Sequence, residues 1–173
     1  MRKTSITLII LLFSISLFGQ LYEQRVGIRM GVTSGISGKI IKDRKVALEG
    51  ILGFRTGGMQ VYGLIESQKQ LINDGIHDFQ LYFGGGGHVG FINGVERYRS
   101  YNSPNGYHYY EEIVTGPVIG LDAIFGVEYT FVKVPITISA DFKPFLELQS
   151  LNRFKANFYD FAIGIRYTFR QFK

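Results

Sequence analysis

The stretch FYDFAIGIRYTF, residues 158–169 near the C-terminus, decides the fold. From Phe161 to Phe169 every second residue is large and apolar, and the positions between them carry Ala162, Gly164, Arg166 and Thr168. Successive side chains of a strand point to opposite faces, so this period of two predicts a strand with one apolar and one small or polar face.

The same alternation recurs along the chain and predicts eight strands. We place them at residues 24–33, 36–42, 46–55, 59–67, 78–93, 117–131, 135–143 and 156–170. Short connections are expected at 42–45 and 132–134, long ones at 94–116 and 144–155, and one of intermediate length at 68–77. An even number of antiparallel strands with both termini at one end is typical of closed bacterial outer-membrane barrels.

Composition excludes several other classes. The 173 residues include 22 Gly, 15 Phe and 11 Tyr but only 4 Pro and no Cys, so collagen-like chains, disulfide scaffolds, thiolate zinc sites and thiol catalysis are excluded. No stretch after the first twenty residues has 18 consecutive apolar residues, which excludes a helical transmembrane protein. The length favours one domain.

The first twenty residues predict a cleaved secretory signal peptide. Arg2 and Lys3 precede an apolar run from Ile6 to Phe18, which ends in Gly19 and Gln20. We therefore expect residues 1–20 to be removed and residues 21–173 to form the folded domain. Loss of the two cations reduces the net charge from +5 to +3, and so modest an excess argues against nucleic acid as a partner.

Alternation alone fits both a membrane barrel with its apolar face outside and a soluble barrel of lipocalin type with its apolar face inside. Three features favour the membrane barrel. The polar faces are rich in glycine, as at Gly84, Gly86 and Gly90, and glycine suits a narrow lumen. Rings lie at strand ends with aliphatic residues between them, as expected at two membrane interfaces. The signal peptide supplies the route to the envelope.

Several segments resemble the small outer-membrane β-barrel proteins of OmpA/OmpX type. The resemblance is carried by the signal peptide, VALEGILGFRTGG at 46–58, LYFGGGGHVGF at 81–91, GLDAIFGVEYTFVKVPITISADFKP at 120–144 and the final IGIRYTF at 163–169. It implies an all-β, eight-stranded antiparallel up-and-down transmembrane barrel in the outer membrane of a Gram-negative bacterium. It further implies recognition of the last strand by the barrel-assembly machinery, through Tyr167 and Phe169, with Phe172 as a second candidate.

The inward faces are expected to carry a network of paired charges. Balanced charges in a narrow barrel can pair with one another, which offsets the cost of burying them and closes the lumen. A selective channel is the alternative, although eight strands seldom leave a water-filled passage. The expected lumen residues are Arg29, Lys39, Glu49, Arg55, Glu66, His88, Asp122, Glu128, Asp141, Lys143, Asp160 and Arg166.

An envelope enzyme acting on lipid A is another alternative. In lipid A deacylases a His and a Ser lie two positions apart on one strand. This chain does not resemble them there, because position 90, two after His88, is glycine. His108 lies near Ser100 and Ser103 in the long outer connection, which is a weak similarity to loop-borne acyltransfer residues. The glycine run at 84–87 lacks the Lys-Ser/Thr of a phosphate loop. We expect no catalysis, no cofactor and no metal.

The connection at 94–116 is the expected recognition surface. Tyrosine gives rigid contact area and Asn, Ser and Gly adapt, as in binding loops. A strand pair extended above the membrane, with a turn at Pro104, Asn105 and Gly106, is the simpler interpretation. We predict a monomer with a structural or adhesive role, an unidentified extracellular ligand, and a second exposed segment from Phe145 to Arg153. The candidate recognition residues are Tyr98, Tyr101, Tyr107, Tyr109 and Tyr110.

Overall fold

The computed structural model describes residues 23–55, 57–73, 77–100, 108–150 and 153–169. The expected signal peptide and its boundary with the folded domain lie outside these residues. The same holds for Tyr101, Tyr107, Ser103, the turn at 104–106 and Phe172. In the described part of the chain, no helix is long and apolar enough to cross a bilayer.

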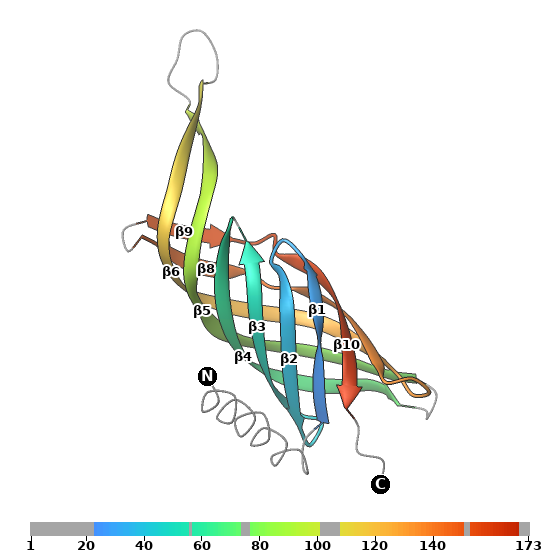
Figure 1. Ribbon diagram of the computed structural model, residues 1–173. Coiled ribbons are helices and arrows are strands. Elements are labelled where there is room, and N and C mark those ends of the chain that lie inside the picture. The colour runs from blue at the N-terminus through green and yellow to red at the C-terminus, as the bar shows by residue number, and fades with distance from the viewer. Residues whose placement is uncertain (1–22, 56, 74–76, 101–107, 151–152, 170–173) are drawn as a thin grey trace, which may run out of the picture.

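All described strands belong to one antiparallel sheet that closes on itself, because β1 pairs with β10 and β5 pairs with β6 (Figure 1). Both ends of the described chain lie at one end of the barrel, which we call the terminal end; the opposite end is the ribbon end. The strands are β1 (Glu23–Gly31), β2 (Ser34–Lys42), β3 (Val46–Arg55), β4 (Gly58–Asn73), β5 (His77–Ser100), β6 (His108–Phe131), β7 (Ile136–Phe142), β8 (Phe145–Gln149), β9 (Arg153–Asn157) and β10 (Phe161–Phe169).

These segments form eight barrel strands, as predicted. β7 and β8 keep one continuous register on β6, since Phe142 lies opposite Phe125 and Phe145 lies opposite Asp122. β9 and β10 are joined by a bulge. From Phe142 to Phe145 the chain advances three residues, whereas their partners Phe161 and Asn157 are four apart. The extra residue leaves Phe158 and Tyr159 both exposed.

The strands are strongly staggered around the barrel. From Ile28 the register runs straight across β2 to β8 and arrives at Phe154, but the closing pair sets Ile28 opposite Ile165, eleven residues further along. One of the eleven is the bulge residue. At about 3.3 Å per residue and a tilt of roughly 40°, Phe154 lies roughly 25 Å above Ile165 along the barrel axis. The rim at the ribbon end therefore slopes upward from β1 to β9.

Two of the expected connections are wrong. The intermediate connection at 68–77 is mostly strand, because β4 continues to Asn73 and pairs there with Asp78. The long connection at 144–155 is a hairpin of β8 and β9. Pro144 lacks an N–H and suggested a strand end, yet its carbonyl still accepts a hydrogen bond from Ala123 N at 2.9 Å, so the strand continues through it.

The apolar faces lie on the outside of the barrel. Ile163 and Ile165 are 55% and 43% exposed and Phe125 is 52% exposed, whereas their neighbours Ala162 and Arg166 are buried. This arrangement is the reverse of a lipocalin-type barrel, so the soluble alternative is wrong.

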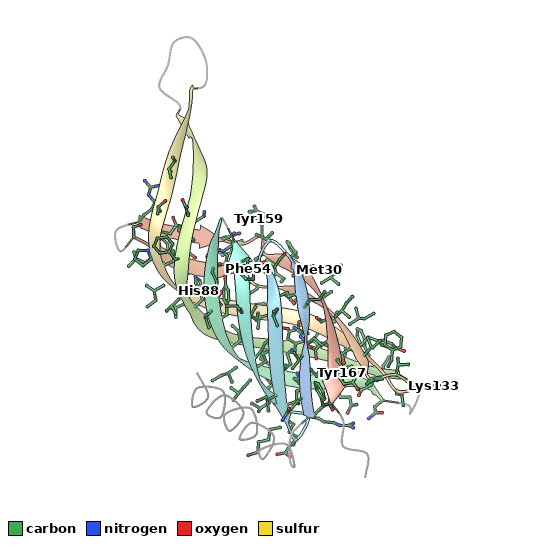
Figure 2. The ribbon with its side chains drawn as sticks, in the orientation of Figure 1. Met30, Phe54, His88, Lys133, Tyr159 and Tyr167 are labelled. Atoms are coloured by element: carbon green, nitrogen blue, oxygen red, sulfur yellow. The ribbon has the colours of Figure 1, made fainter. Side chains whose placement is uncertain are left out.

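Rings border the apolar wall at both ends. At the terminal end, the ring centroids of Tyr167 and Phe169 are 4.7 Å apart and those of Tyr129 and Phe131 are 4.8 Å apart. Figure 2 shows Tyr167 at this end and Phe54 and Tyr159 near the other. The wall between them is a continuous apolar surface of the kind that matches a bilayer core.

Glycines on the inner face leave space for larger neighbours. A Cβ added at Gly126 would meet the Tyr82 ring, and one at Gly120 would meet the imidazole of His88. At Gly86 an added Cβ would meet the backbone of Gly63 and Leu64, which cannot move aside as a side chain can. Glycine at these positions is therefore a packing requirement of the narrow lumen.

We predict that Gly86→Val destabilises the barrel by more than about 3 kcal/mol, because the added methyl groups would collide with backbone on the neighbouring strand. Urea unfolding of the protein reconstituted in lipid vesicles measures the effect. Gly63→Ala is the matched control, since a Cβ there meets nothing within 4 Å. Equal stability of the two variants would contradict this account of the inner glycines.

Candidate functional site

The structure places all twelve expected lumen residues inside the barrel, each at most 6% exposed. Their side chains gather into two ion clusters at different levels. The terminal cluster lies nearer the terminal end and consists of Arg25, Lys39, Glu49, Glu66, Glu128 and Arg166. The ribbon cluster lies nearer the ribbon end and consists of Arg29, Arg55, His88, Asp122, Asp141, Lys143, Glu147 and Asp160.

Glu128 is the centre of the terminal cluster. Its carboxylate accepts hydrogen bonds from Lys39 at 2.7 Å, from Arg166 at 3.1 Å and from Arg25. These three cations come from β1, β2 and β10, and Glu128 comes from β6 on the opposite wall, so the contacts span the lumen.

The remaining carboxylates of the terminal cluster share the same cations. Arg166 donates to Glu49 at 2.6 Å, and the Lys39 ammonium lies 2.8 Å from Glu66 and 3.5 Å from Glu49. Ser37 and Ser139 accept two further N–H groups of Arg166. Arg25 also pairs with Glu23 at 2.7 Å, so every cation of the terminal cluster faces at least one carboxyl group.

One half of the ribbon cluster is built around His88. Its Nδ1 lies 2.7 Å from Asp122 and its Nε2 lies 2.9 Å from Glu147. Lys143 donates to the other oxygen of Asp122 at 3.0 Å, and Arg55 donates to Glu147. Each ring nitrogen of His88 thus faces a carboxylate, and each carboxylate also faces a cation.

The other half of the ribbon cluster is built around Arg29 and Asp160. Arg29 donates to Asp141 at 2.6 Å and lies 3.4 Å from Asp160. Asp160 also accepts from the backbone N–H and hydroxyl of Thr33, at 3.1 and 2.8 Å, and pairs with Lys143 at 3.1 Å. Asp160 follows the bulge directly, and its contacts connect the bulge to the β1–β2 turn.

A layer of buried apolar and ring residues lies between strands β3, β4, β5 and β6 in the lumen. It is formed by Ile51, Tyr62, Leu64, Tyr82 and Ile124. Its two tyrosines contact the ion clusters: Lys39 lies 4.0 Å from the Tyr82 ring centroid and Lys143 lies 4.1 Å from that of Tyr62. Ions, rings and aliphatic side chains together fill the described lumen.

Two residues of the clusters were missed by sequence reasoning. Arg25 follows the same alternation as Arg29 and could have been assigned to the lumen from it. Glu147 was placed in an outer connection because the strand was expected to end at residue 143. Phe145, expected on the exposed surface, is 2% exposed and lies beside His88 at a ring-centroid distance of 5.6 Å. The expectation of an exposed segment from Phe145 to Arg153 is therefore wrong for Phe145, Glu147 and Gln149, which are buried, whereas Leu146 is exposed and residues 151–152 lie outside the described residues.

The clusters do not assemble a recognisable catalytic or metal centre. Among the described residues, no group of three His, Asp or Glu side chains is arranged to hold a metal ion. His88 faces carboxylates and rings, and Gly90 leaves no nucleophile two positions away. The two clusters hold six buried cations among seven buried carboxyls across the barrel.

β5 and β6 extend beyond all their neighbours as a two-stranded ribbon, residues 92–100 and 108–116. The last pair between β4 and β5 is Met59 with Phe91, and the last between β6 and β8 is Val118 with Gln149. The ribbon continues to Ser100 opposite His108, and Figure 1 shows it projecting from the barrel. At about 3.4 Å per residue the added pairs span roughly 27 Å.

The structure places three of the five candidate recognition tyrosines on the ribbon. Tyr98 lies opposite Tyr110, and Tyr109 lies opposite Arg99. Tyr101 and Tyr107 fall in the undescribed residues between the two strands. At the other end of the barrel, the expected assembly-signal residues Tyr167 and Phe169 are about half exposed on the outer wall.

Comparison with known proteins gives a similarity of structure but not of sequence. No known protein family and no curated protein matches the sequence. Among solved structures, the chain is similar to the N-terminal beta-barrel domain of Pseudomonas aeruginosa OprF, with a TM-score of 0.44 and 13% identity over 86% of this chain and 96% of that chain. The barrel assignment rests on the strand pairing described above.

We predict that Glu128→Ala lowers the free energy of unfolding by about 3–5 kcal/mol, because it leaves Lys39, Arg25 and Arg166 short of a buried counter-charge. Urea unfolding in lipid vesicles measures the change. Lys133→Gln, in the exposed β6–β7 turn, is the control and should cost at most about 1 kcal/mol. A loss from Glu128→Ala no larger than that of the control would show that the cluster does not hold the wall together.

Proposed function

We propose that this OmpA/OmpX-like barrel spans the outer membrane of a Gram-negative bacterium, performs no catalysis, and acts as a closed scaffold that displays the β5–β6 ribbon for binding at the cell surface. The observation that carries the proposal is the ribbon itself: two strands of one barrel hairpin continue well past every neighbouring strand. A barrel whose only task was to seal a wall would need no such extension.

The outer wall supports the membrane location. Its exposed apolar residues would be costly in water but match lipid tails, and the closed sheet leaves the backbone paired within the bilayer. With the terminal end facing the periplasm, the ribbon projects outside the cell. Tyr167 and Phe169 then lie at the periplasmic interface, where the barrel-assembly machinery could read them.

The lumen supports a scaffold rather than a channel or an enzyme. Conduction would require ions to displace side chains such as Arg166 and Lys39 that are held by several carboxylates. Lipid chemistry would require a nucleophile near a histidine, and His88 contacts only carboxylates and rings among the described partners. The ribbon remains the part of the chain best suited to recognition.

The ribbon is suited to recognition by its backbone as well as its composition. Beyond Val118, Ser150 still donates to the carbonyls of Pro117 at 2.8 Å and Thr115 at 3.2 Å on the outer edge of β6. Farther along the ribbon, each strand has a strand partner only on its inner side within the described residues. Its outer edges can accept hydrogen bonds from an extended partner, and its tyrosines add contact area. We propose a monomer as the working form and an extracellular ligand as its partner.

We predict that the purified protein migrates faster in detergent gels when unheated than when boiled, as a compact barrel does.

On intact cells, added protease should cleave within residues 98–110 and leave the rest of the barrel protected. Peptide mapping of the digested cells measures this. Protection of the ribbon together with cleavage at residues 132–135 would place the barrel in the opposite orientation.

We predict that deletion of residues 98–110 abolishes surface binding and leaves the barrel resistant to detergent without heating, because the described ion clusters of the lumen are built from residues outside that segment. The measurement compares adhesion of cells that display the full or the deleted chain to extracellular-matrix proteins and host cells. A variant with all five candidate tyrosines changed to serine separates ring contacts from the ribbon's backbone. Unfolding of the barrel on deletion would contradict the assignment of the ribbon.

A further inference from the structure

The outer wall has a hollow over β2, β3 and β4. Gly38, Gly50 and Gly63 are direct cross-strand neighbours on the outward face, and a Cβ added at any of them would meet nothing within 4 Å. The hollow measures about 620 Å³. Here the wall presents backbone, as it also does at Gly87 of β5, which lies opposite Gly63.

The rims of the hollow are apolar. Ile40 and Leu48 flank it toward the terminal end, with Ile65 and Val26 beside them, and each of these is about half exposed or more. The hollow is therefore shaped and lined for a hydrocarbon chain, which gains dispersion contacts there that a flat wall would not provide.

Between the hollow and the terminal end, the same strands and the turn that joins β2 to β3 carry a basic cluster of exposed residues: Lys42, Arg44, Lys45 and Lys69. The β2–β3 turn holds the first three, and it is fixed to β4 by a 2.7 Å hydrogen bond from Gln68 N to Lys45 O. Asp43 is the one exposed acid of this turn. The cluster is thus a positive surface that favours an anion.

Alternation sets the cluster and the hollow on one face. Lys42 is four residues beyond Gly38 on β2, and Lys69 is six residues beyond Gly63 on β4, so both belong to the outward positions. Four residues of strand correspond to about 13 Å. A negatively charged headgroup at the cluster would therefore place its acyl chain along the wall toward the hollow.

We propose that β2, β3 and β4 form a binding site for an anionic phospholipid of the inner leaflet, with the phosphate at the basic cluster and one acyl chain in the glycine-lined hollow. This inference rests on the proposed membrane location and orientation. The site needs both parts, because the basic cluster selects a negatively charged headgroup and the hollow holds one acyl chain of the same lipid.

Charge also distinguishes this occupant from a second copy of the chain. Two copies inserted in the same direction and packed hollow to hollow would bring two Lys42–Lys45 turns together at the same leaflet. Repulsion between the two basic turns opposes this association, whereas an anionic headgroup neutralises their charge.

The test reconstitutes the chain in bilayers of equimolar phosphatidylglycerol and phosphatidylcholine, extracts it in mild detergent, and identifies retained lipid by native mass spectrometry. We expect preferential retention of phosphatidylglycerol. Gly50→Leu fills the hollow and should lower that retention about tenfold, and Lys42→Gln with Lys69→Gln should lower it roughly thirtyfold at low ionic strength. The controls are Ala140→Leu, which adds bulk to the exposed wall of β7, and Lys133→Gln, which removes a cation from the β6–β7 turn; both should retain lipid as the parent does.

Three outcomes would overturn the proposal: retention without preference for the charged headgroup, equal effects of the hollow variant and its control, or a dimer in the parent that Gly50→Leu converts to monomer. Each leaves the membrane barrel intact if the gel shift on heating persists. Failure of the chain to insert into either lipid would instead remove the proposed location, and with it the premise of the site.

Discussion

The rest of the structure depends on the requirement that every backbone N–H and C=O of a membrane-spanning strand be paired within the protein. A sheet meets this requirement only by closing, and closure here depends on the pairing of β1 with β10. Once the sheet is closed, alternate side chains of each strand face opposite environments: one set meets lipid and the other is confined to the lumen. Glycines then become necessary wherever a ring such as Tyr82 crosses that lumen.

The confined charges follow from the same constraint. A side chain such as Glu128 that enters an eight-stranded lumen has little water to solvate it, so it is stable there only beside cations supplied by other strands. The contacts from Lys39, Arg25 and Arg166 meet that need, and because they come from the opposite wall they also hold the cylinder in shape. The same side chains that stabilise the wall therefore fill the lumen, which is why a structural role and a conducting role compete in this fold.

The sequence predicts the faces of the strands much better than their ends. Ile163 and Arg166 could be assigned to opposite faces because alternation is a property of each strand by itself. Strand ends depend on partners instead. Pro144 lies between β7 and β8 without interrupting their register on β6, because β6 bonds to its carbonyl and does not need its missing N–H. The bulge at Phe158 and Tyr159 appears only when the registers of two neighbouring strands are compared. Glu147 was missed because the strand end near it was misplaced. The cations and carboxyls around Glu128 were all assigned to the lumen except Arg25, which the alternation of β1 would also have placed there.

The middles of the strands were predicted well and their ends poorly. The same division separates residues that the barrel constrains from residues that can vary for a function. Inside the bilayer, pairing, packing and charge balance fix nearly every position. Beyond Phe91 and Val118 these constraints end, yet β5 and β6 remain paired with each other for many residues. An isolated two-stranded ribbon is marginally stable by itself. Because the ribbon continues two strands that the closed barrel already holds in register, the barrel removes the cost of nucleating it.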